Sequence, residues 1–184
     1  MKFKTFLFLA FLLSNQCLKA QGFGQHDPSI DWQTIDTEQV RVVFPSGTAL
    51  QAQRIADIIY YLHARKKESI GMRSKKIDVI LQTQQVVSNG FVTLAPYRSE
   101  LFGTAPPNFK YLGSTEWLDL LTIHEYRHAL QYANANRGFT RLMYWIGGEN
   151  GWASALFSSI PDWYLEGDAV LAETLYTQNG RGRN

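Results

Sequence analysis

The residues best suited to chemistry in this chain are two histidines four positions apart, His124 and His128, with Glu125 directly after the first. Apolar residues surround them at helical spacing, and side chains four apart on a helix project from one face. Two such imidazoles can bind one zinc ion at about 2.0–2.1 Å. Glu125 lies at the edge of that face, where it can take a proton from water that the metal activates. The alternative is a pair of helix histidines with ordinary hydrogen bonds.

A catalytic zinc ion needs a third protein ligand and an open position for water. The other two histidines are poor candidates, because His26 precedes the folded domain and His63 lies in a basic segment. Glu166 is a better candidate, since it is acidic within an apolar and aromatic segment. Glu173 follows seven residues later on the same helical face and can accept a hydrogen bond from a ligand imidazole. The alternatives are stabilisation of a helix N-terminus by Glu166 and a surface charge at Glu173.

The elements that must position these residues follow from the apolar pattern and from the turn residues. We predict three strands, a helix before the second strand, a loop after the third, and three helices that end the chain. The strands are expected at 40–45, 77–81 and 91–95, the loop at 99–114, and the helices at 49–71, 115–138, 139–146 and 161–176. This order predicts an α+β fold in which a small mixed sheet is followed by an active-site helix and further helices.

The N-terminal residues 1–20 have the pattern of a secretory signal peptide. Lys2 and Lys4 precede an unbroken apolar run, which is too short to span a bilayer, and Ala20 offers a small residue for cleavage. We therefore expect an exported protein, periplasmic or secreted, without a transmembrane segment after cleavage. Residues 21–38 are expected to form a leader and residues 39–184 the domain.

Composition excludes several classes of protein. The chain has 184 residues, 45% of them hydrophobic, which is enough for one domain with a real core. Removal of the signal, with Lys2, Lys4 and Lys19, leaves 15 basic and 16 acidic residues, so nucleic acid is not an expected partner. Cys17 is the only cysteine and lies in the signal, which excludes disulfides and thiolate ligands in the mature chain.

Together the two segments, His124–His128 and Trp163–Ala169, resemble the motifs of the gluzincin metallopeptidases. The pattern His-Glu-x-x-His followed by Trp-x-x-Glu-Gly-x-Ala is similar to that of the aminopeptidase N family, with a longer spacing that makes 139–159 an insertion. The resemblance implies a zincin-like domain in which both histidines and Glu166 bind zinc and Glu125 is the general base. The layout is also similar to exported bacterial proteins that place such a domain before a β-propeller.

Two departures limit what the resemblance implies. The Gly-x-Met-Glu-Asn segment that captures the substrate amine in aminopeptidases is absent, so strict aminopeptidase activity is not expected. Members of that family take a tyrosine or histidine from the region after the third ligand to stabilise the oxyanion, whereas this chain stops eleven residues after Glu173. We therefore expect a chain truncated at its C-terminus, with a missing domain and weak activity alone. The expected function is a zinc-dependent peptidase acting on peptides or proteins. The alternative is a non-catalytic metal-binding or scaffold module of a larger exported protein.

Overall fold

The structure, a computed structural model, describes residues 27–107 and 115–183. The signal peptide expected at 1–20 lies outside the described residues, and so do His26 and the end of the loop expected at 99–114. The chain divides into two units, Met1–Ile30 and Asp31–Asn184. The following description concerns the second unit.

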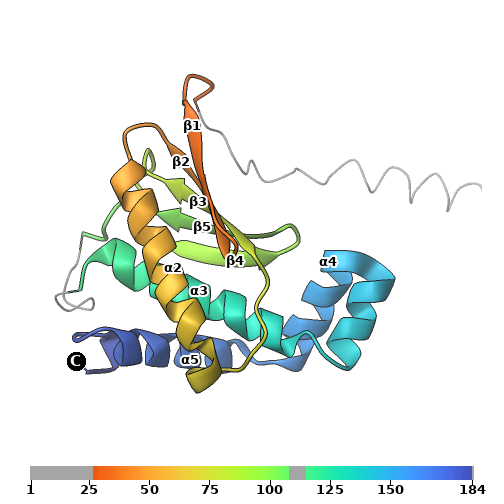
Figure 1. The fold of residues 1–184 in the computed structure, drawn as a ribbon. Coiled ribbons are helices and arrows are strands. Elements are labelled where there is room, and N and C mark those ends of the chain that lie inside the picture. The colour runs from red at the N-terminus through yellow and green to blue at the C-terminus, as the bar shows by residue number, and fades with distance from the viewer. Residues whose placement is uncertain (1–26, 108–114, 184) are drawn as a thin grey trace, which may run out of the picture. The chain divides into compact units, whose positions relative to one another are not determined.

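A five-stranded mixed sheet forms one layer of this unit (Figure 1), which confirms the α+β fold class. Its strands are β1 (Trp32–Asp36), β2 (Val40–Pro45), β3 (Ile77–Gln82), β4 (Gly90–Leu94) and β5 (Tyr97–Phe102), in the order β1-β2-β3-β5-β4. The three central strands are parallel, whereas β1 and β4 run antiparallel to their neighbours. The strand β4 therefore forms one edge of the sheet.

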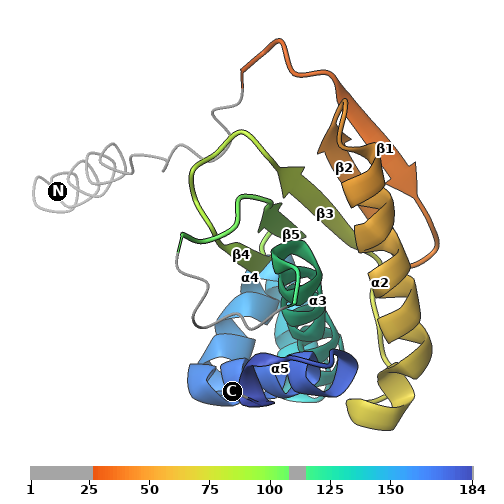
Figure 2. The same ribbon diagram turned by 90° about the vertical axis from the view of Figure 1, so that its left-hand side faces the viewer.

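The helices are α2 (Ala49–Ser69), α3 (Trp117–Ala135), α4 (Phe139–Ser159) and α5 (Asp162–Tyr176), followed by the 3₁₀ turn η3 (Arg181–Arg183). Figure 2 shows that α2 and α3 pack on the same face of the sheet. Alternate residues of the strands, such as Val42 and Val79, are buried there against Ile55 and Ile59 of α2 and Leu121 of α3. This shared core fixes α3 beneath the edge strand β4.

Two strands differ from the sequence prediction. The strand β1 lies within the segment expected to be a leader, and β5 lies partly within the expected loop. Both are short and rich in polar residues, so their apolar signal is weak. In β5 the residues Tyr97, Ser99 and Leu101 are nevertheless buried in alternation, and pairing with β3 and β4 on both sides supplies the hydrogen bonds.

The helix α4 is longer than predicted, because the chain resumes a helix after a kink instead of ending near Ile146. The kink lies at Gly148, whose φ of 58° is readily adopted by glycine alone. The second half carries Trp152, whose fully buried indole packs on the rings of Tyr97 and Tyr144. Among residues 27–107 and 115–183, no helix has the length and apolar character needed to cross a bilayer.

Candidate metal centre

The helix α3 carries His124, Glu125 and His128 into the interior of the domain. Its residues from Leu120 to Ala133 are all buried, because the sheet covers one side of the helix and α5 packs on another. The two histidines are only 8% and 5% exposed, and Glu125 is 5% exposed. Polar groups this deeply buried need partners, since burial without them is costly.

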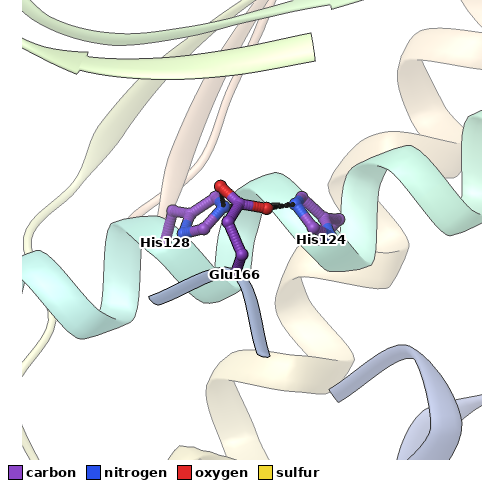
Figure 3. A group of neighbouring side chains, drawn as sticks. All are labelled: His124, His128 and Glu166. Carbon is purple, nitrogen blue, oxygen red and sulfur yellow. Dashed lines mark hydrogen bonds and ion pairs between the residues drawn. The ribbon is translucent and has the colours of Figure 1, made fainter. Parts of the chain in front are cut away.

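The helix α5 supplies the third residue of the group, Glu166 (Figure 3). Its Oε2 lies 3.2 Å from Nε2 of His124 and its Oε1 lies 3.4 Å from Nε2 of His128. The two Nε2 atoms are themselves 3.2 Å apart. Among the described residues these three form the one group of His, Cys, Asp and Glu side chains whose ligand atoms converge, all within 4.8 Å, and it can hold a metal ion.

The other ring nitrogen of His124 is held by a buried carboxylate. Its Nδ1 lies 2.6 Å from Oε1 of Glu173, a residue of α5 with no exposed surface. Arg181 of η3 in turn donates to both oxygens of Glu173. Burial would raise the pKa of Glu173, but the hydrogen bonds from Arg181 and His124 outweigh it and lower that pKa. The charged carboxylate can only accept, and it lies closer to Nδ1 of His124 than the Nη2 atom of Arg181, at 2.6 Å against 2.9 Å, so Nδ1 carries the proton and the Arg181 contact is not a hydrogen bond.

His128 is held in the same way by Gln131, one turn later on α3. Oε1 of Gln131 lies 2.9 Å from Nδ1 of His128, and its Nε2 donates to the backbone oxygen of Leu165 and to Asp168. Because the amide group of Gln131 donates elsewhere, its oxygen must accept the Nδ1 proton of His128. When both imidazoles are neutral, each directs an Nε2 lone pair at the same point, and a carboxylate faces them. A cation fits this arrangement of three acceptors.

The charges around the centre shift the pKa values of the two histidines in opposite directions. Burial lowers the pKa of His128, and the neighbouring charge of His124 lowers it further. Burial also acts to lower the pKa of His124, but the hydrogen bond to Glu173 and the nearby carboxylates outweigh it, so the net shift is upward. One positive charge in this pair therefore disfavours a second.

Glu125 lies beneath the start of the edge strand β4. A Cβ atom at Gly90 would lie 2.9 Å from both Cγ and Oε1 of Glu125, so only glycine allows the strand to approach this closely. Burial raises the pKa of Glu125 to about 7, although the charge of His124 acts in the opposite direction. A carboxylate with this pKa is suited to exchange protons near neutral pH.

The sequence-predicted residues thus lie together: the three expected ligands converge, and Glu173 contacts the imidazole of His124. The alternative of a surface charge does not describe Glu173, which is fully buried. His63 contacts Tyr126 through Nδ1 at 3.0 Å instead of joining the group. Sequence reasoning missed Gln131, whose position three residues after His128 was an available signal, and Arg181, for which the sequence offers none.

Comparison of the chain with protein-family models, curated proteins and solved structures gives no match. The interpretation of the site therefore depends on its own geometry and chemistry.

Proposed function

We propose that this chain is an exported zinc-dependent peptidase of the gluzincin type. The observation that carries the proposal is the convergence of His124, His128 and Glu166, which come from two helices and present three acceptors to one point. A helix pair with ordinary histidine hydrogen bonds has no need for this arrangement. The proposed export rests on the signal-like pattern of residues 1–20.

Zinc is the metal that the ligand chemistry favours. Two imidazoles and a carboxylate are a known ligand set of catalytic zinc, and ligands at about 2.0–2.1 Å in a tetrahedron lie about 3.3–3.4 Å apart. The 3.2 Å between the two Nε2 atoms is close to that value. The side chain of Glu166 is 60% exposed, which leaves this side of the group accessible to water and substrate.

Within this proposal each remaining residue has a task. Zinc would lower the pKa of water and polarise the peptide carbonyl. Glu125 would take the water proton and pass it to the leaving amine. The strand β4 lies at the edge of the sheet with its start against Glu125, so an extended peptide could pair with it and present a carbonyl near the ligands.

The metal is tested first, with full-length purified protein. Elemental analysis should give about one zinc per chain, and His124→Ala, His128→Ala and Glu166→Ala should each lose it, because each removes a ligand. If Glu166→Ala kept its full zinc content, the third ligand would be misassigned. If the wild type bound no zinc, the metal centre itself would be refuted.

Catalysis is tested on a mixed peptide library with Glu125→Gln. The substitution is nearly isosteric and removes no ligand, so zinc content and fold should be kept while hydrolysis falls by at least about 10²-fold. Glu68→Gln, on the exposed end of α2, is the matched control and should be fully active. Equal activity of Glu125→Gln and the control would remove Glu125 from the mechanism. Zinc binding without hydrolysis in any form would instead support the non-catalytic module.

A further inference from the structure

The chain beyond α5 folds back on the last turns of that helix. Gly180 makes this possible, because a Cβ atom there would lie within about 2.6 Å of the backbone of Glu173 and Thr174. The amide of Gly182 then donates to Oγ1 of Thr174 at 3.1 Å, and Arg183 donates to the backbone oxygen of the same residue at 3.0 Å. The polar sequence Gly-Arg-Gly-Arg is thus a specific returning turn.

This turn delivers Arg181 to the far side of the metal centre. Its Nε donates to Oε2 of Glu173 at 2.6 Å, and its Nη2 donates to Oε1. Oε1 is the oxygen that accepts the Nδ1 proton of His124. The guanidinium therefore reaches the imidazole of His124 through the carboxylate, and its Nη2 also lies 2.9 Å from Nδ1 of that imidazole.

The contact between Arg181 and Glu173 keeps the carboxylate charged and also sets its orientation. Glu173 has no exposed surface. Among the described residues, the side chains that donate to its carboxylate are those of Arg181 and His124. Without Arg181 the buried carboxylate would keep His124 as its one side-chain donor of these two. A guanidinium that contacts both oxygens of a carboxylate restricts the rotation of the carboxylate plane. The orientation of that plane determines where Nε2 of His124 points, because the imidazole is held through its opposite nitrogen.

We propose that Arg181 is a positioning residue of the metal centre: it holds Glu173 in the orientation that directs His124 at the ion. This inference rests on the proposed function, since it requires a metal at His124, His128 and Glu166. It assigns the C-terminal turn Gly180–Arg183 to the site, to which neither sequence motif points.

The experiment uses the full chain and Co²⁺ as a spectroscopic substitute for the native metal. Arg181→Gln removes the contact with both carboxylate oxygens, and Arg181→Lys keeps the charge but offers one point donor. Arg137→Gln, at an exposed arginine just after α3 and outside the turn, is the control. Metal affinity is measured by competition with a chelator and ligand geometry by the visible absorption of Co²⁺. Melting of the metal-free proteins measures fold separately.

We expect Arg181→Gln to bind Co²⁺ at least about 10-fold more weakly with an altered absorption spectrum, and Arg181→Lys to be intermediate. Arg137→Gln should keep the affinity and spectrum of the wild type. An affinity and spectrum in Arg181→Gln equal to those of the control would overturn the inference. If Arg181→Gln does not fold, Arg181→Lys decides in the same way. A wild type that binds no Co²⁺ would instead overturn the proposed metal centre, and this inference with it.

Discussion

The close approach of β4 to α3 can be tested by adding one methyl group at Gly90. In Gly90→Ala the new Cβ would lie 2.7 Å from Cδ1 of Leu121 and 2.9 Å from Cγ and Oε1 of Glu125. Nonbonded carbon atoms prefer about 3.5–4.0 Å, so the strand or the two side chains must move apart by about 1 Å. The substitution therefore overpacks the junction between the edge strand and the proposed general base.

The size of the effect follows from this displacement. Overpacking by extra carbon atoms costs about 1–3 kcal/mol, which for a domain of this size lowers the melting temperature by about 2–12 °C. The rate of hydrolysis should fall by up to about 10²-fold even where the protein stays folded, because a shift of about 1 Å in a reacting group can cost that much in rate. Metal affinity should stay unchanged, since neither Leu121 nor Glu125 is a proposed ligand.

Gly103→Ala is the matched control. At Gly103, just after β5, the nearest atoms to an added Cβ are the backbone oxygen of Gln82 and Cδ1 of Leu81, both at an ordinary 3.6 Å. Thermal melting, zinc content and hydrolysis of the peptide library are compared for both variants. If Gly90→Ala melts and hydrolyses like Gly103→Ala, the strand does not constrain Glu125 and the reasoning is refuted.

Two further predictions concern the fold away from the ligands. Trp152→Ala should lower the free energy of unfolding by about 3–5 kcal/mol, because the indole is fully buried. Trp145→Ala on the same helix, with a side chain 70% exposed, should change it by at most about 0.5 kcal/mol in the same urea titration. For His63, burial and the charge of Lys66 lower its pKa, so the unfolded chain binds more protons near pH 6 and stability is lost as pH falls below about 6.5. With a chelator present to remove bound metal, the melting temperature of His63→Gln should therefore fall less from pH 7 to pH 5 than that of the wild type. An equal fall in the two proteins would contradict this account.

The local parts of the site could be predicted from the sequence. The spacing of His124 and His128 places both on one helix face, whatever the helix packs against. Glu166 and Glu173 have the same property, since seven residues are about two turns. The structure shows His124 and His128 on α3 and the two glutamates on α5. The observed bounds of α5 differ from the predicted 161–176 by one residue at its start. These predictions needed only helical periodicity.

The parts that depend on tertiary pairing could not be predicted in this way. The strand β5 contains Arg98 and Glu100, which pair with each other on one face of the sheet and make the segment too polar for an apolar signal. Its strand conformation follows from hydrogen bonding to neighbours on both sides, which no local pattern encodes. The same holds for Arg181, which lies 57 positions from His124 in sequence and reaches it only because the chain turns back at Gly180.

The dependence of the centre on α5 links metal binding to the docking of that helix. The helix α5 supplies the proposed ligand Glu166 and also Glu173, which accepts a hydrogen bond from His124. It further supplies Asp168, which accepts hydrogen bonds from Gln131 and Arg127. Its contact with α3 is made by small and apolar buried residues such as Ala169 and Leu165. These apolar contacts and the hydrogen bonds between the two helices hold three carboxylates near two imidazoles, and a bound cation would add attraction between Glu166 and the two histidines. A ligand present at about 1,000 times its dissociation constant adds about 4.1 kcal/mol to the stability of the form that binds it. Metal binding should therefore raise the melting temperature of the domain, and in hydrogen exchange it should protect the amides of α5 more strongly than those of α2, because undocking of α5 would dismantle the ligand set.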